Sequence, residues 1–258
     1  MITKLTYIKG SKPIKSILSN SSISHNAHVS GSFVSAQREL IIDPILDNNS
    51  WEVIRIVCEN GEAGNYWAVG DVKNVIGGDG NKRKVKMVDT TGLYGKHVVF
   101  QFINTTDATY KFNDGFSNDY STSLLRVTSM PTIKHEILSN ELAMVLTDTT
   151  FKVAQNGKST TLIEVTEKLF VPAEKELRVN RNYSVQEEFD ALTTFEYWQT
   201  NSTDNPHILR DSQNVAHNYW NRSPRTDSDT SACFINTAGT STKQTVSAPC
   251  TVTVCFSF

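Results

Sequence analysis

The sequence predicts an α+β fold of short antiparallel strands, two to three short helices and many loops. Short apolar runs show a two-residue alternation, and turn-forming clusters of Gly, Asn and Asp separate them. Helical patterning is confined to a few segments, and strands and helices do not alternate as they would in a parallel βαβ sheet. With 258 residues, the chain is long enough for one large domain with a substantial core.

Residues 1–48 differ in composition from the rest and predict an extended N-terminal arm for assembly or attachment. They are rich in Ser, Asn, Lys and Ile and contain no Trp. The turn formers Asp43-Pro44 and Asp47–Ser50 mark a boundary, so the main domain is expected at residues 49–258. The alternative is that residues 1–48 form an ordinary first hairpin of the same domain.

The sequence of the first part of this domain predicts β-hairpins. Trp51–Cys58 alternates with a period of two, and Tyr66–Val69 would return as its partner strand after a type I′ turn at Asn60-Gly61. The glycine-rich stretch 76–81 is expected to be a hairpin turn and not a nucleotide-binding loop, because no helical pattern or Lys-Ser/Thr follows it. Further strands are expected at residues 85–89, 97–103, 151–153 and 162–165.

Helical patterning begins after a polar loop at residues 104–121. Ser121 or Thr122 is suited to cap a first helix, and Pro131 suits the first turn of a second. Residues 172–177 are expected to start a short third helix. The segments that are ambiguous or loop-like are 189–198 and 200–214.

The stretch that begins at residue 217 is expected to organise the domain. An aromatic pair followed by Arg, Ser and Pro predicts a buried plug and a sharp exit, and two strands joined by a loop follow. The last strand, Cys250–Phe258, would close the domain. The plug comprises Tyr219, Trp220, Arg222, Ser223 and Pro224.

Three charged residues, one in the plug and two at the start of the expected third helix, are interpreted as structural. Arg222 would satisfy loop carbonyls beneath the aromatic pair, the alternative being an anchor for a ligand or partner. Glu174 and Glu176 would stabilise the positive end of a helix, because they lie two residues apart and do not face one another.

The plug also carries a family resemblance. The phrase Tyr219-Trp220-x-Arg222-Ser223-Pro224, a Gly-marked hairpin and then Ala248-Pro249 resemble a domain family of bacterial and bacteriophage proteins with the signature W-W-x-R-S-P and then G-V-x-P. Tyr219 stands in place of the family's first Trp, and Ser247-Ala248 in place of Gly-Val. The resemblance covers residues 49–258 in order, and its other matching segments are Trp51–Ile54 with Tyr66–Asp71, Ser123–Arg126 and Leu169–Glu176. It implies a C-type-lectin-like fold, related to formylglycine-generating enzymes and to the variable tip proteins of phages.

Neither activity associated with that fold is expected here. C-type lectins hold calcium through motifs such as Trp-Asn-Asp, whereas Trp220-Asn221-Arg222 places a cation where the carboxylate would be. Formylglycine-generating enzymes need two active-site thiols, whereas Cys250 and Cys255 would point to opposite faces of a regular strand. Asp227-Ser228-Asp229 offers too few oxygens for calcium. No nucleophile–base motif appears, so no catalytic residue, cofactor or metal is predicted.

Composition limits the partners and the compartment. A net charge of −2 provides no basic field for nucleic acid or anionic lipid. No signal peptide or stretch of membrane-spanning length is recognised, so membrane insertion is not expected. The four cysteines are expected to be reduced and buried, while a pairing of Cys233 with Cys250 or Cys255 stays open.

Aromatic doublets suggest where a ligand could bind. Tyr-Trp pairs at 66–67, 197–198 and 219–220 would each place one ring in the core and one outside if they lie on strands. Exposed Tyr and Trp suit sugar stacking and protein interfaces. The predicted ligand or partner surface comprises Tyr66, Tyr197, Asn205, Arg225 and Asp227.

These observations lead to an expected function. The chain is predicted to be a non-enzymatic bacteriophage virion protein, such as a capsid decoration, tail or baseplate component, that displays its domain for binding. The expected partners are other virion proteins through residues 1–48, a host cell-surface glycan or protein, and further copies of itself in a homo-oligomer. The phage assignment rests on the resemblance, the absent export signal and the polar arm. The alternatives are a purely architectural virion protein without a ligand and a bacterial surface adhesin domain.

Overall fold

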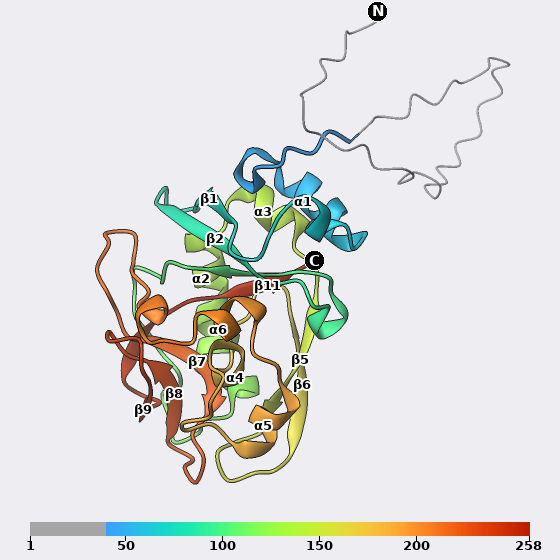
Figure 1. Ribbon diagram of the computed structural model, residues 1–258. Coiled ribbons are helices and arrows are strands. Elements are labelled where there is room, and N and C mark those ends of the chain that lie inside the picture. The colour runs from blue at the N-terminus through green and yellow to red at the C-terminus, as the bar shows by residue number, and fades with distance from the viewer. Residues whose placement is uncertain (1–39) are drawn as a thin grey trace, which may run out of the picture.

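The computed structural model describes residues 40–258, so most of the predicted arm lies outside the described residues. Its last nine residues pack against the domain (Figure 1). They include the 3-10 turn η1 (Leu46–Asn48), and the side chains of Ile42 and Leu46 are buried in the core. In the described part of the chain, no helix has the length and apolar character needed to cross a membrane.

The fold is a mixed α+β arrangement, as predicted, with two main sheets and a separate hairpin (Figure 1). The four-stranded sheet has the order β1 (Val72–Ile76), β2 (Lys82–Asp89), β3 (Val99–Phe102) and β11 (Cys255–Ser257). The five-stranded sheet has the order β4 (Tyr110–Lys111), β10 (Pro249–Val252), β7 (Tyr219–Pro224), β8 (Ser231–Ile235) and β9 (Ser241–Thr245). The separate hairpin pairs β5 (Thr149–Ala154) with β6 (Leu162–Glu167). All pairings are antiparallel except β7 with β10.

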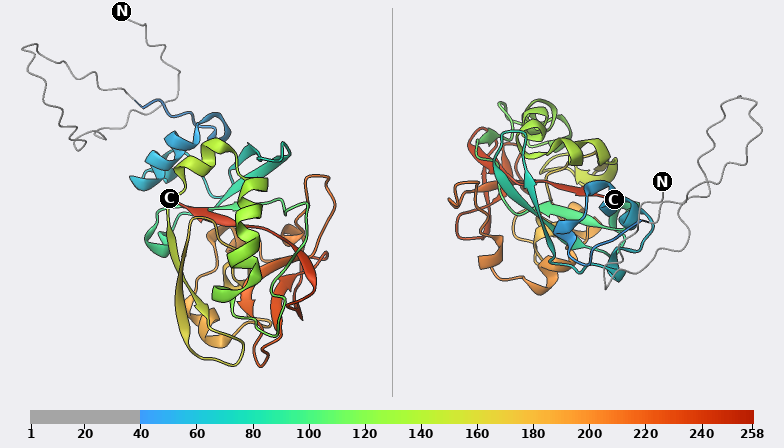
Figure 2. Two further views of the ribbon diagram at one scale, coloured as in Figure 1. Left: turned by 180° about the vertical axis from the view of Figure 1, so that it is seen from behind. Right: turned by 90° about the horizontal axis from the view of Figure 1, so that it is seen from above.

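Short helices and turns connect and cover these sheets. A short π-helix, η5 (Leu125–Ser129), runs directly into α2, and seen from behind α2 crosses the middle of the molecule (Figure 2). The α-helices are α1 (Trp51–Glu59), α2 (Met130–Ile137), α3 (Asn140–Val145), α4 (Glu174–Leu177), α5 (Gln186–Ala191) and α6 (Glu196–Thr200). The remaining 3-10 turns are η2 (Ala63–Asn65), η3 (Leu93–Gly95), η4 (Tyr120–Thr122) and η6 (Asn205–His207).

The core beneath the four-stranded sheet is aromatic. The rings of Phe100 on β3 and Phe256 on β11 stack with centroids 5.3 Å apart, and Trp51 of α1 meets both edge-on at 5.9 and 5.6 Å. Such pairs contribute about 0.5–1.5 kcal/mol each beyond the area they bury. The last strand therefore closes the domain by packing as well as by pairing, as expected from the sequence.

The predicted opening hairpin is wrong, because Trp51–Glu59 is a helix. The buried residues Trp51, Ile54, Val57 and Cys58 recur at helical spacing. Ser50 caps the helix, since its side chain accepts a hydrogen bond from the backbone N–H of Val53 at 3.3 Å. The segment Tyr66–Val69 is accordingly not a strand but follows turn η2.

Two further expectations need correction. The helix after the polar loop is capped by Ser123 and not by Ser121 or Thr122, since the Ser123 hydroxyl accepts from the backbone N–H of Arg126 at 3.2 Å. The single strand expected at Cys250–Phe258 is two strands, because the chain leaves the five-stranded sheet after Val252 and enters the four-stranded sheet.

The other expected elements are present. Pro131 lies in the first turn of α2, residues 174–177 form a helix, and stretch 76–81 turns between β1 and β2. The ambiguous stretch 189–198 contains the end of α5 and most of α6. All four cysteines are free and buried, as predicted, although Cys250 and Cys255 lie on different strands and not on two faces of one.

Candidate functional site

Strand β7 lies buried between β10 and β8, and all five predicted plug residues are buried. The hydroxyl of Tyr219 donates to the carbonyl of His207 at 3.0 Å, and the indole N–H of Trp220 donates to the carbonyl of Tyr110 at 2.8 Å. Both rings are buried and their polar groups are hydrogen-bonded inside the protein. The prediction that one ring of each doublet faces outward is therefore wrong for Tyr219-Trp220.

The side chain of Arg222 forms a fully buried ion pair with Glu176 of α4. Its guanidinium contacts both carboxylate oxygens and also donates to the carbonyl of Val171 at 2.8 Å. The hydroxyl of Tyr94 donates to the same carboxylate, and the ring of Phe151 lies 4.2 Å from the guanidinium carbon. Burial alone would lower the pKa of Arg222, but the carboxylate of Glu176 outweighs it, so the arginine stays charged.

A second buried carboxylate, that of Glu174, connects α4 to residues 182–184 and to β9. Glu174 accepts hydrogen bonds from the backbone N–H groups of residues 182–184, at 2.8 to 3.3 Å, and from the hydroxyl of Ser241. The backbone N–H of Glu174 donates to Ser223 at 3.0 Å. We call Leu169–Glu176 and Tyr219–Pro224 the signature segments. Their charged groups hold the scaffold together, which extends the structural interpretation of Arg222, Glu174 and Glu176.

Glu188 of α5 is a third buried carboxyl group near this cluster. One oxygen accepts from the backbone N–H of Ala154 at 2.6 Å, and the other has no hydrogen-bond partner among the described residues. Burial raises the pKa of Glu188 to about 7, and the hydrogen bond from the backbone N–H of Ala154 offsets only part of this rise. This group therefore changes its protonation near neutral pH.

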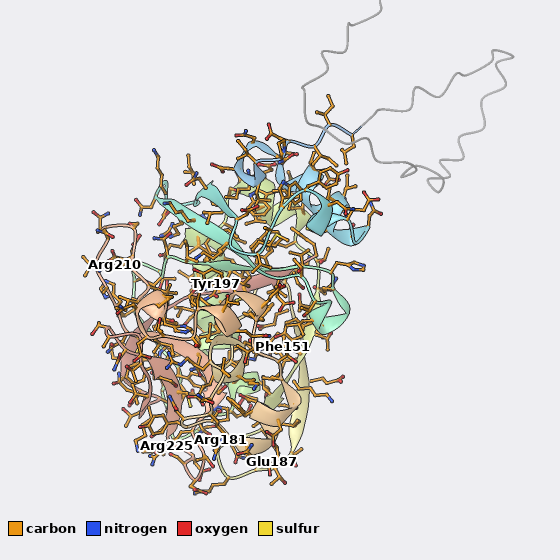
Figure 3. All side chains as sticks on the ribbon, viewed as in Figure 1. Phe151, Arg181, Glu187, Tyr197, Arg210 and Arg225 are labelled. Carbon is orange, nitrogen blue, oxygen red and sulfur yellow. The ribbon has the colours of Figure 1, made fainter. Side chains whose placement is uncertain are left out.

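A hollow opens beside the buried ion pair, between η3, the β5–β6 hairpin and the end of α5. We call it the Tyr94 pocket; it has a volume of about 230 Å³. Its lining residues are Leu93, Tyr94, Thr150, Phe151, Lys152, Glu164, Ala191, Leu192 and Thr193. Figure 3 labels Phe151, on the β5 side of this region.

The backbone of Tyr94 is strained. Its φ angle is +59°, a left-handed conformation that costs a residue other than glycine about 1–3 kcal/mol. The bond to Glu176 holds the residue there, and burial raises the pKa of Tyr94 far above its ordinary value, so the phenol stays a donor. The buried pair thereby fixes the position of an aromatic ring that lines the pocket.

The pocket's chemistry suits a small polar ligand that also has an apolar face. Tyr94 supplies ring surface, while Thr150 and Thr193 offer hydroxyl groups. Lys152 and Glu164 lie opposite each other on β5 and β6, and the described structure shows no ion pair between them. These hydrogen-bonding groups resemble the small set of directional contacts typical of ligand sites.

The five residues predicted as a ligand surface do not form one site. Tyr197 lies on α6, where the ammonium of Lys86 sits 3.8 Å from its ring centroid, and Arg225 lies at the lower end of the molecule (Figure 3). Tyr66 follows η2 and is half-buried, while Asn205 is exposed in η6.

Arg225 and Asp227 alone share a segment. They lie after β7, in a loop that packs closely on Gly157: a Cβ on that glycine would lie 1.8 Å from the carbonyl oxygen of Arg225. The backbone N–H of Asp227 donates to the carbonyl of Gly157 at 2.7 Å. Asp229 of the same loop pairs with Lys158, so its carboxylate is already engaged by a cation.

Within residues 40–258, one group of three potential metal ligands comes together, and a cation already occupies its centre. Asp79, Asp107 and Glu136 all bond to one guanidinium nitrogen of Arg83, at 2.7, 2.9 and 3.1 Å. The arginine neutralises part of their charge, so the cluster ties the β1–β2 turn to α2.

Sequence reasoning missed Tyr94 and Glu188. For Tyr94 the available signal was its position between Gly92 and Gly95, which both adopt positive φ angles and form a tight turn. For Glu188 no comparable signal exists, because its burial depends on the packing of α5 against β5.

Comparison with known proteins matches residues 89–258 to the family described as "Domain of unknown function (DUF6273)". This segment contains the buried ion pair, the Tyr94 pocket and both signature segments. No curated protein matches the chain, and no solved structure does.

Proposed function

The chain belongs to the DUF6273 family, and from this premise we propose that it is a non-enzymatic bacteriophage virion protein that binds a ligand or partner. Its domain would be a C-type-lectin-like module carried on a capsid decoration, tail or baseplate component. The sequence resemblance supports the fold variant and the phage setting, and the closing strand β11 is compatible with both.

The observation that supports the binding role is that the charged side chains of the signature segments are engaged with groups inside the protein. Glu176 and Arg222 neutralise each other without solvent exposure, and Glu174 is held by backbone N–H groups. Acid–base catalysis needs a titrating group that can reach a substrate. These residues support a rigid scaffold instead, and the Tyr94 pocket lies directly beside it.

The ligand that this pocket fits best is a saccharide unit of a host surface. A sugar ring has one apolar face for Tyr94, and hydroxyl groups for Thr150, Thr193 and Glu164. Residues 1–48 would mount the domain on other virion proteins, with several copies on one particle. The competing roles are a purely architectural virion protein and a bacterial surface adhesin.

The binding role is tested with fluorescently labelled full-length protein on an array of bacterial surface saccharides. We expect Thr193→Arg, which fills the pocket, and Glu164→Ala, which removes a hydrogen-bond acceptor, to weaken binding at least about ten-fold. Glu187→Ala is the matched control: this glutamate is exposed on α5 outside the pocket (Figure 3). If Thr193→Arg binds as the unaltered protein does, the pocket is not the site.

The virion assignment is tested separately. Antibodies against the protein should decorate phage particles in electron micrographs and should not label bacteria that carry no phage. Labelling of uninfected cell surfaces would instead favour the adhesin role.

A further inference from the structure

A larger hollow lies on the other side of the fold, between α2, α3 and the β1–β2 turn. We call it the α2–α3 cavity; its volume is about 510 Å³, within the range of roughly 300–1,000 Å³ typical of small-molecule sites. Its lining residues are Gly78, Lys134, His135, Leu138, Asn140, Ala143, Leu146 and Lys168. The left view of Figure 2 shows α2 and α3 from this side.

Local geometry fixes the walls of this cavity. Helix α2 ends at Ile137, and Ser139 caps α3 by accepting from the backbone N–H of Leu142 at 3.2 Å. The β1–β2 turn closes one side, because Gly78 approaches α2 so tightly that a Cβ there would lie 2.1 Å from the carbonyl oxygen of His135. The backbone contact at Gly78 therefore fixes one wall of the cavity.

The lining is cationic at one part and apolar at another. Lys134 and Lys168 contribute two ammonium groups, and among residues 40–258 neither makes an ion pair or a side-chain hydrogen bond. Leu138 and Leu146 are each only 6% exposed, and together with Ala143 they form an apolar wall.

The carboxylates near this cavity are engaged elsewhere. Glu167 pairs with Arg126 and accepts from Tyr120, Glu136 bonds to Arg83, and Glu141 accepts from the backbone N–H of Trp51. No carboxylate lines the cavity itself, although the charge of Lys134 also acts on the carboxylate of nearby Glu167.

We propose that the α2–α3 cavity binds a small amphipathic anion, a carboxylate or phosphate monoester carried on an apolar body. The ammonium groups of Lys134 and Lys168 would hold the anionic head, and Leu138, Ala143 and Leu146 would contact the apolar part. This site is independent of the Tyr94 pocket, with which it shares no residue.

Nucleic acid fits this site less well. The lining contains no Phe, Tyr or Trp on which bases could stack, and two lysines and one histidine do not form a track along a phosphate backbone.

The test uses octyl phosphate below its micelle-forming concentration, with the full-length protein, in an isothermal titration. We expect one octyl phosphate per chain, with octanol and inorganic phosphate each binding at least about ten-fold more weakly, since each lacks half of the interaction. Equal binding of octanol and octyl phosphate would overturn the proposal.

Variants locate the binding. Lys134→Gln and Lys168→Gln should each weaken octyl phosphate at least about ten-fold, and Ala143→Trp, at an exposed position, should block the cavity. Lys84→Gln is the matched control, because Lys84 is an exposed lysine of β2 outside the cavity. Unchanged melting temperatures show that the variants are folded. The assignment would be contradicted if Lys134→Gln and Lys168→Gln lost no more affinity for octyl phosphate than Lys84→Gln does. It would also be contradicted if folded Ala143→Trp still bound octyl phosphate.

A final arm identifies the source of the ligand. Sedimentation with vesicles of phosphatidic acid and phosphatidylcholine distinguishes a membrane lipid from a free amphiphile. Co-sedimentation that Lys134→Gln abolishes supports a lipid ligand, and octyl phosphate binding without co-sedimentation supports a free one.

Discussion

Two arginines of this protein are buried to the same degree but have opposite surroundings. The side chains of Arg222 and Arg83 both have no solvent exposure. Arg222 faces one carboxylate, Glu176, which is also fully buried. Arg83 faces three carboxylates, from Asp79, Asp107 and Glu136, whose side chains remain 24%, 29% and 13% exposed.

The difference shows how burial decides the consequence of losing a charge. At Arg222 the two charges balance, and water cannot reach whichever one is left alone. At Arg83 the carboxylates outnumber the cation and each keeps some contact with water, so they can be solvated or protonated when the arginine is lost. The first arrangement is therefore sensitive to any single change, whereas the second is tolerant.

The largest expected effect follows from breaking the fully buried pair. Glu176→Gln removes the negative charge and leaves the guanidinium of Arg222 uncompensated in the core. The free energy of unfolding should fall by about 3–5 kcal/mol. Urea denaturation followed by tryptophan fluorescence measures this fall.

The double variant Glu176→Met with Arg222→Met is its control. Removing both charges avoids an orphaned ion, so this variant should be more stable than Glu176→Gln. If the single variant loses less than about 1 kcal/mol, the pair is not the desolvated ion pair that we describe.

The second prediction concerns pH, for which the two regions should respond with opposite signs. Near Arg222, burial raises the pKa of Glu188 from 4.5 to about 7, so the folded state binds more protons and stability falls as the pH rises through this window. The fall should be about 3 kcal/mol. Near Arg83, the guanidinium lowers the pKa of Asp79 from 3.8 to about 2, so its contribution is lost as the pH falls through that range.

Urea titrations from pH 2 to pH 8 test this contrast. Glu188→Gln should flatten the curve between pH 4.5 and pH 7 and leave the acid limb unchanged. Asp79→Asn should do the reverse. A Glu188→Gln curve parallel to that of the unaltered protein would show that this carboxyl group does not titrate abnormally.

The smallest effect is expected from Arg83→Met. The three carboxylates lose their shared partner but can rely on water and other donors, such as Asn81 for Asp79 and Asp107, and Tyr110 for Glu136. The loss should be about 1–3 kcal/mol, clearly below that of Glu176→Gln in the same urea assay. An equal or larger loss would mean that exposure of the carboxylates gives no protection.

Local signals in the sequence predicted much of this fold, and they failed where two periodicities overlap. Trp51–Cys58 is rich in β-branched residues and alternates, yet it is a helix. Its apolar residues also recur three and four apart, and Ser50 and Glu52 are a helix start signal. Contact with α3, through Glu141 and the backbone N–H of Trp51, favours the helix and cannot be read from the segment itself.

The candidate site was less predictable than the fold. The role of Arg222 as a structural group followed from its place in a buried plug, but its partner Glu176 lies 46 residues earlier. The side chains of the Tyr94 pocket come from η3, the β5–β6 hairpin and the residues after α5. Such a site depends on how distant elements pack, which neither periodicity nor motif spacing records.

The passage from β10 to β11 has a consequence for the order of events during synthesis. Strand β10 lies between β4 and β7 in one sheet. Strand β11 pairs with β3, and in this pairing Ser257 lies opposite Val99, which was translated 158 residues earlier. A nascent chain that has not yet emerged through residue 252 therefore lacks an interior strand of one sheet and an edge strand of the other. Until then both sheets expose unpaired backbone groups, which can pair with strands of other chains.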